Sequence, residues 1–230
     1  MKVNLYEEIE SEPIGSVEYV DHMGDDITIV NSARVSFGKH KQDLDQQDLK
    51  LIKYLVKHRH TSVFEHNVIT FRFKVPLFIR SQHMRHRTWS YNEISRRYTD
   101  FNIEFYNPNK FRTQHLSNRQ ASNLEHNNPM IYGTTASKFV EDHAQASLEA
   151  FNELTSLGIC REQARMVLPQ NMYTEYYGTT NLNNLLKFID LRTHMGAQWE
   201  IQKVAEACLE IATDLWPITV TSYRELRGAA

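Results

Sequence analysis

Residues 85 to 98, RHRTWSYNEISRRY, concentrate hydrogen-bonding side chains in one short stretch of the chain. The fourteen residues include four arginines, a histidine, two serines, an asparagine and a single glutamate. A guanidinium group presents its donors in a rigid plane that matches phosphate oxygens or a pair of carbonyls. Short hydroxyl and amide side chains in a turn leave backbone N–H groups free to face an anion. The stretch therefore predicts an anion-binding site, and the alternative is a solvated basic surface.

The charge of the whole chain narrows the class of ligand. Lys and Arg number 26 and Asp and Glu number 28 among 230 residues, so the basic field of a nucleic-acid-binding protein is missing. Positive charge is local instead, because five arginines lie between Arg80 and Arg97 with only Glu93 to oppose them. A local cationic cluster on a near-neutral chain favours a small anionic ligand and no nucleic-acid partner.

The hydrophobic pattern indicates one mixed α and β domain over residues 1–230. Residues 67–75 alternate apolar and polar side chains, which predicts a half-buried strand, and Pro76 begins a predicted helix. Residues 172–180 predict another strand, and the polar segment 113–129 is expected to be an exposed loop or insertion. Apolar side chains at helical spacing predict further helices over 48–58, 137–158, 161–169 and 197–215.

Three common motifs of nucleotide and acyl chemistry are absent from the sequence. No GxG occurs, so the glycine turn that holds a pyrophosphate in dinucleotide-binding folds is missing. The pair Gly38-Lys39 lacks the spacing of a P-loop, and there is no GxSxG elbow. If this chain binds a dinucleotide, its side chains, together with those of a neighbouring subunit, must replace the glycine loop.

Residues 58–66, HRHTSVFEH, form a second polar cluster. The histidines His58, His60 and His66 lie near a carboxylate, as the ligands of a zinc site often do. Arg59 stands between the first two histidines, and fixed positive charge disfavours a divalent cation. The sequence therefore predicts no metal site. Ordinary helix-end histidines, a metal-dependent hydrolase and the polar wall of an anionic cofactor site stay open as alternatives.

Two more arginines, Arg165 and Arg192, lie in mainly apolar segments. Such an arginine usually extends to solvent or pairs with a carboxylate, and Asp190 is an available partner for Arg192. The alternative is that both guanidinium groups face the site that the first arginine cluster forms. Cys208 lies on the apolar stripe of its helix, so we expect it to be inert core.

The cysteines and the hydrophobic profile indicate a compartment. Cys160 and Cys208 are far apart and outside any CxxC spacing, which predicts reduced thiols in the cytoplasm. The acidic first 20 residues lack the apolar region of a signal peptide, and no apolar run is long enough to cross a bilayer. We expect a cytoplasmic protein without a membrane partner.

Five blocks in order along the chain resemble the flavin-dependent thymidylate synthase family. The main block is RHR, seven further residues and then Ser95, inside the wider pattern SxNExSxRY. Only the stretch around 107–145 is outside the resemblance. The other four blocks are SARVSF at 32–37, HRHTSVFEH at 58–66, ARMVLP at 164–169 and LR…AQWEIQ within 191–202.

The resemblance implies an activity and an assembly. Members of this family reductively methylate dUMP to dTMP, with methylenetetrahydrofolate as the carbon donor and with NADPH to reduce a bound FAD. The fold it implies is an α/β domain with a mixed, largely antiparallel sheet flanked by helices, assembled as a homotetramer that holds FAD and dUMP where subunits meet. A non-catalytic nucleotide- or RNA-binding module that uses the arginine cluster is the alternative.

The resemblance also implies roles for individual residues. Arg192 is the expected catalytic residue, because a fixed cation beside the uracil ring stabilises the anion formed when the ring loses its N–H proton. Ser95 has no adjacent base, so we expect it to bind substrate and not to act as a nucleophile. The expected FAD contacts are Ser62, Arg85, His86, Arg87, Glu93, Asn181, His60 and Glu65. The expected dUMP contacts are Gln82, Arg85, Glu93, Ser95, Arg96, Arg97, Arg165 and Arg192.

The chain departs from the family pattern at two positions. Asn183 stands where relatives commonly carry an arginine, which removes one positive charge from the expected FAD side. Gly196 stands where relatives place a histidine four residues after the uracil-binding arginine, and His194 lies two residues earlier. Neither cysteine follows a proline, as the nucleophile does in the unrelated type of thymidylate synthase, so no covalent thiolate step is expected.

Overall fold

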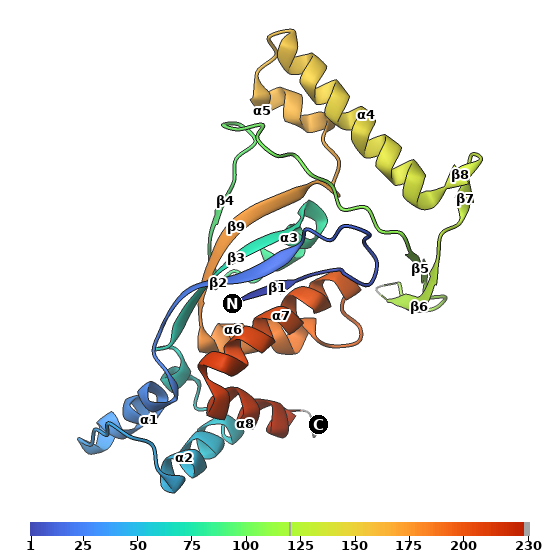
Figure 1. Ribbon diagram of the computed structural model, residues 1–230. Helices are drawn as coiled ribbons and strands as arrows, with labels where there is room; N and C mark the ends of the chain where they lie inside the picture. Colours follow the sequence, from blue (N-terminus) through green and yellow to red (C-terminus); the bar gives the residue numbers. More distant parts are fainter. Residues whose placement is uncertain (120, 228–230) are drawn as a thin grey trace.

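A five-stranded antiparallel sheet lies at the centre of the protein (Figure 1). The computed structural model describes residues 1–119 and 121–227. The strand order is β1-β2-β3-β9-β4, so β9, from late in the chain, lies between two strands from its first half. The predicted mixed α and β domain is confirmed, and every pair in this sheet is antiparallel. The strands are β1 Lys2–Asn4, β2 Ser16–Met23, β3 Val68–Pro76, β9 Tyr173–Asn181 and β4 Ser90–Glu93.

The alternating pattern of β3 is confirmed as a half-buried strand. Ile69, Phe71 and Phe73 are fully buried, whereas the side chain of Arg72 on the opposite face is 49% exposed. Along its whole length β3 pairs with β9, and Phe73 stands opposite Tyr176. This long ladder aligns the end of β3, where α3 begins, with the start of β9.

Helices α3, α6 and α7 pack against the buried face of the sheet (Figure 1). The predicted apolar stripe of α7 is confirmed, because Ile201, Val204 and Cys208 are fully buried. Burial also raises the pKa of the Cys208 thiol, which agrees with an inert core cysteine. These helices span Leu77–His83 (α3), Leu182–Arg192 (α6) and Trp199–Leu215 (α7).

Two helical groups extend from opposite ends of the sheet (Figure 1). At one end, α1 (Asp26–Arg34), α2 (Gln46–Lys57) and α8 (Pro217–Arg227) pack on one another. At the other end, α4 (Ala136–Ser156) and α5 (Arg161–Ala164) form an arm. The arm has a small core of its own, made of Phe151, Ala164, Leu168 and Met172. Within the described residues, the remaining helical elements are the 3-10 turns η1 Val35–Phe37, η2 Thr61–Phe64 and η3 Arg165–Val167.

The prediction that residues 113–129 form a loop is wrong. Strands β5 (Phe111–Gln114) and β6 (Ser122–Asn127) pair as an antiparallel hairpin instead. Its polar composition conceals the alternation by which a strand is usually recognised. Two short strands, β7 (Met130–Ile131) and β8 (Thr134–Thr135), then lead into α4. Within the described residues, no helix is both long enough and apolar enough to span a membrane.

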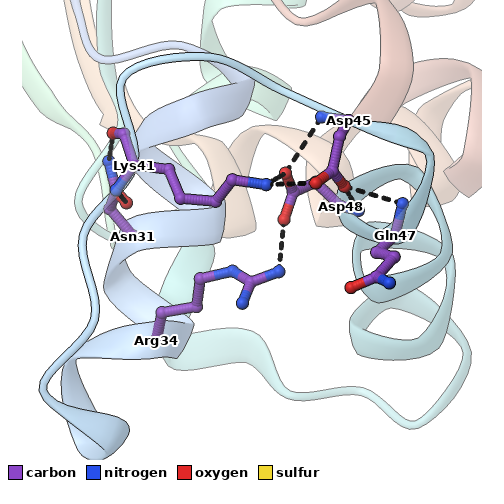
Figure 2. Close-up of polar contacts among 6 residues, drawn as sticks. All are labelled: Asn31, Arg34, Lys41, Asp45, Gln47 and Asp48. Carbon is purple, nitrogen blue, oxygen red and sulfur yellow. Dashed lines mark hydrogen bonds and ion pairs between the residues drawn. The ribbon is translucent and has the colours of Figure 1, made fainter.

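A buried carboxylate, Asp48, joins α1 to α2 (Figure 2). Its side chain is fully buried and accepts hydrogen bonds from Arg34 at 2.5 Å and from Lys41 at 2.5 Å. Asp45 caps the N-terminus of α2 and donates its backbone N–H to Asp48 at 3.0 Å. Burial alone would raise the pKa of Asp48, but the hydrogen bonds from Lys41, Asp45 and Arg34 lower it to about 2. Arg34 belongs to the SARVSF block, and here it stabilises the fold.

We expect Asp48→Asn to lower the free energy of unfolding at neutral pH by about 2 kcal/mol, because it removes two charge-assisted hydrogen bonds. The folded-state pKa lies below the ordinary value of 3.8, so the wild-type carboxylate contributes stability above pH 4 and loses that contribution as the pH falls toward 2. Urea unfolding at pH 7 and pH 3 measures both effects. Asp43→Asn, at an exposed aspartate in the same connection, is the control, and equal losses in the two variants would contradict the role of Asp48.

Candidate functional site

The RHR block follows a helix whose end is held by a buried histidine. His83, the last residue of α3, is fully buried, and its Nδ1 shares a hydrogen bond of 2.8 Å with the hydroxyl of Tyr176. The rings of Phe73, Trp89 and Phe188 surround it at centroid distances of 4.7, 4.6 and 4.7 Å. Burial, with smaller contributions from His86 and Arg192, keeps the pKa of His83 well below its usual value, so the imidazole is neutral.

This anchoring leaves the two arginines of RHR in solvent. Arg85 and Arg87 are exposed, and within the described chain neither guanidinium group has a hydrogen bond or an ion pair. The hydroxyl of Tyr91 donates to the carbonyls of His83 and His86 at 3.0 and 3.1 Å, which closes the turn between α3 and β4. The turn therefore presents two unpaired cations from a rigid backbone.

A cleft of about 620 Å³ lies between the α4–α5 arm and the edge of the sheet where β4 ends. It collects four of the residues expected to bind nucleotide, namely Glu93, Ser95, Arg96 and Arg165. The full lining is Leu77, Arg80, Glu93, Ile94, Ser95, Arg96, Glu162, Arg165, Met166, Leu168, Gln170, Met172 and Thr174.

Glu93 is held rigidly in this cleft. Arg80 donates to its two carboxylate oxygens at 2.9 and 2.8 Å, and the hydroxyl of Thr174 donates at 2.7 Å. A bidentate guanidinium pair fixes both the position and the plane of a carboxylate. Arg80 and Thr174 therefore support the cleft, and the sequence had indicated neither of them as a site residue. No pattern in the local sequence pairs Arg80 with Glu93. Thr174, the third member of the group, lies on the distant strand β9.

The arginines in and beside the cleft have different roles. Arg165 is exposed and has no hydrogen-bond or ion-pair partner for its side chain in the described chain, so its guanidinium group is free to bind an anion. Arg97 pairs with Glu162 at 3.0 Å, and both side chains are largely exposed, so a phosphate could replace this carboxylate at little cost.

Arg96 differs from the other arginines of the cluster because it is buried. It donates to the carbonyl oxygens of Phe101 and Asn102 at 2.7 and 3.3 Å. Its guanidinium group thus stabilises the loop after β4, while the residue still lines the cleft. Any dUMP contact of Arg96 must coexist with these two bonds.

A second cluster lies where α3 meets the end of α6. Arg192 donates from Nε to His86 Nε2 at 3.1 Å and from Nη2 to the carbonyl of Gln82 at 3.4 Å. Asp190, the carboxylate next to it in sequence, accepts a hydrogen bond from Tyr223 at 2.5 Å. Among the described residues the Arg192 guanidinium forms no ion pair, so its positive charge is not neutralised locally.

The expected FAD residues away from RHR form a third group, beside the start of β3 and the end of β9. His60, at the N-terminus of η2, and Ser62, within it, are exposed. Asn181 caps α6 by accepting the backbone N–H of Asn184 at 2.9 Å. Asn183, at the position where relatives commonly carry arginine, donates to Glu65 at 2.9 Å. The substitution therefore replaces a cation by a neutral amide that holds this carboxylate.

Two observations bear on the metal alternative for residues 58–66. The ring of Tyr54 lies 4.3 Å from the ring of His58 and 5.7 Å from that of His60, centroid to centroid. In the described part of the chain, no three His, Cys, Asp or Glu side chains come together as a potential metal site. In one protomer, the expected site residues are divided among the cleft, the RHR turn, the Arg192 cluster and the η2 group.

Comparison with known proteins identifies the family. The family model described as thymidylate synthase complementing protein matches residues 18–218 of this chain. The flavin-dependent thymidylate synthase of Thermus thermophilus is 43% identical over 217 residues, which are 94% of this chain and 78% of that protein. This chain belongs to the flavin-dependent thymidylate synthase family.

Other family members and one solved structure agree with this assignment. The flavin-dependent thymidylate synthase of Kosmotoga olearia is 38% identical over 209 residues, 91% of this chain and 90% of that protein. The crystal structure of the UMP/dUMP methylase PolB from Streptomyces cacaoi, bound with 5-Br dUMP, is similar with a TM-score of 0.78 and 32% identity. That similarity covers 91% of this chain and 94% of that chain.

The state of His86 in this family member gives a test of the Arg192 cluster. Burial, and then the nearby Arg192 charge, lower the pKa of His86 to about 4, so its Nε2 is a neutral acceptor above that pH. We expect Arg192→Gln to raise this pKa only part of the way toward 6.5, because burial is the larger cause. An NMR titration of the histidine ring protons measures the shift. A pKa of His86 near 6.5 in the wild type would contradict the geometry.

Proposed function

We propose that this chain reductively methylates dUMP to dTMP, with methylenetetrahydrofolate as the carbon donor and NADPH-reduced FAD as the hydride source. The observation that carries the proposal is the cleft, in which Arg165, unpaired in the described chain, and Ser95 lie near a rigidly held Glu93. Family membership and the similar fold of a methylase bound with 5-Br dUMP support it.

The residues in and beside the cleft suit the phosphate end of a nucleotide. Arg165 offers a free guanidinium group, and Arg97 exchanges its exposed partner Glu162 at small cost. Ser95 adds a hydroxyl at the same wall, and in the described residues no base is hydrogen-bonded to it that would make it a nucleophile. These groups bind and orient dUMP, while the Arg80–Glu93 pair keeps the floor of the cleft in one conformation.

Arg192 suits the pyrimidine end. Its guanidinium group is positioned by two neutral acceptors, His86 and the carbonyl of Gln82, and so retains its full charge. A preorganised cation is effective where negative charge develops during a reaction. Arg192 would therefore stabilise the uracil anion that forms on loss of the ring N–H proton, without a covalent thiolate.

The residues expected to hold FAD have the donors that this group needs. Arg85 and Arg87 present unpaired guanidinium groups, and His60 and Ser62 are exposed, which fits a pyrophosphate without a glycine loop. His86, Glu93, Asn181 and Glu65 complete the proposed FAD set. The bound flavin would supply the hydride chemistry.

Assembly and location complete the proposal. The expected site residues are divided among four places on one protomer, so we propose that a homotetramer unites them, with FAD and dUMP held between copies. We also propose a cytoplasmic location, because reduced cysteines are typical of the cytoplasm and nucleotide synthesis takes place there.

We expect Arg165→Ala to raise the KM for dUMP about tenfold or more, because it removes a charge-assisted contact to phosphate, while the bound FAD content stays unchanged. The measurement is an anaerobic dTMP assay with dUMP, methylenetetrahydrofolate and NADPH. Arg161→Ala, four residues earlier on the same arm and paired with the exposed Asp100, is the control. If the two variants have equal KM values for dUMP, Arg165 does not have the role assigned to it. An inactive, flavin-free wild type would refute the proposed function.

Replacing both cysteines tests the absence of a thiolate nucleophile. Cys160 is exposed and Cys208 is buried in the core. We expect the double variant Cys160→Ala, Cys208→Ala to form dTMP at a kcat within about twofold of the wild type, with slightly lower thermal stability from the small cavity at Cys208. Circular dichroism verifies folding, and a folded but inactive double variant would show that a cysteine takes part.

A further inference from the structure

Two carboxylates line the cleft, and they are held in different ways. Arg80 and Thr174 fix Glu93 by three hydrogen bonds. Glu162, on α5, has one ion pair among the described residues, with Arg97 at 3.0 Å, and the two side chains are 61% and 47% exposed. If Arg97 turns to a bound phosphate, Glu162 is left as an unneutralised negative charge in the wall of the cleft.

The arm fixes the position of Glu162. Two residues later in α5, Ala164 is fully buried in the small core of the arm. One residue earlier, Arg161 pairs with Asp100 at 3.0 Å, so this cation already has a carboxylate. The loop after β4 carries both Arg97 and Asp100, and two ion pairs therefore join it to α5. Glu162 thus stays at the cleft, and in the described chain it has no second ion pair.

The charges around the phosphate end match a single phosphate group. Four guanidinium groups and two carboxylates line the cleft or lie beside it: Arg80, Arg96, Arg97 and Arg165, with Glu93 and Glu162. Together they leave a surplus of two positive charges. A phosphate monoester carries about −1.5 to −2 charges at pH 7, so one phosphate group neutralises this surplus.

Charges outside this set do not alter the balance. Three further carboxylates act electrostatically on the buried Arg96, but each already pairs with another cation. The pairs are Glu175 with Arg72, Glu104 with Lys74 and Asp100 with Arg161. In the proposed assembly, Arg192 faces the uracil anion, and Arg85 and Arg87 face the pyrophosphate of FAD. Each of these cations therefore has a negative partner of its own.

We propose that Glu162 is a specificity-determining residue that selects nucleoside monophosphates over nucleoside diphosphates and triphosphates. This inference rests on the proposed function, and it adds the phosphorylation state that the cleft accepts. A second phosphate group adds at least one negative charge, which finds no surplus cation and is repelled by Glu162. Volume does not make the selection, because a cleft of about 620 Å³ is within the size range that holds drug-sized ligands.

The test measures the dissociation constants of dUMP and dUDP by calorimetry on the FAD-loaded protein. Glu162→Gln keeps the size of the side chain and removes its charge, so we expect the ratio of the dUDP and dUMP constants to fall at least about threefold. The effect is modest because the carboxylate is exposed to solvent. Glu162→Asp keeps the charge, and we expect its ratio to lie near the wild-type value. In about 1 M salt the screening length shortens to about 3 Å, so we expect the ratios of the wild type and Glu162→Gln to converge.

The matched control is Asp100→Asn, which breaks the neighbouring ion pair between the same loop and α5 at a carboxylate outside the cleft lining. We expect its ratio to stay within about twofold of the wild type. An unchanged ratio in Glu162→Gln, or an equal fall in Asp100→Asn, overturns the proposal, because Glu162 then acts on the position of the arm alone or not at all. A wild type that forms dTMP while Glu162→Gln leaves the ratio unchanged refutes this inference alone. A wild type that neither binds dUMP nor forms dTMP refutes the proposed function as well.

Discussion

The neutral imidazole of His83 is the contact on which the site depends. A charged histidine could not lie between Phe73, Trp89 and Phe188 without a large desolvation cost, and burial keeps this one uncharged. Its bond to Tyr176 ties the last turn of α3 to the interior strand β9. Since α3 is only seven residues long, this anchor and the fully buried Ile79 together fix the orientation of its polar side chains.

Side chains on two sides of α3 contact two different parts of the proposed site. Arg80 and Gln82 are two positions apart, and residues with that spacing point to different sides of a helix. Arg80 reaches Glu93 in the cleft, whereas Gln82 reaches Gln198 and, through its carbonyl, Arg192. A displacement of α3 would therefore disturb the phosphate end and the base end of the proposed site together. The helix works as the common support of both.

Electrostatic pairing separates the arginines that build the protein from those that can bind a ligand. Arg34, Arg80 and Arg112 each face a carboxylate that is well buried or tightly held. Such pairs are costly to break, because they leave a charge without a partner. Arg85 and Arg165 are exposed and unpaired within the described chain, so binding an anion there displaces only water. A count of positive charges in the sequence cannot make this distinction, because a paired arginine and an unpaired one are the same residue type.

The local hydrophobic pattern of the sequence determined much of the architecture. The two-residue alternation of β3, the apolar stripe of α7 and the buried thiol of Cys208 follow from periodicity, because burial of one face is the same requirement wherever the element lies. The ordered blocks around RHR also pointed to the right family. Partners were decided only by the tertiary structure. Glu93 meets Thr174, Gln82 meets Gln198, and the polar segment expected as a loop folds back as the hairpin that brings Arg112 to Glu200. Each of these contacts joins residues more than 80 positions apart, and no local periodicity encodes which distant side chain will fill a hydrogen bond.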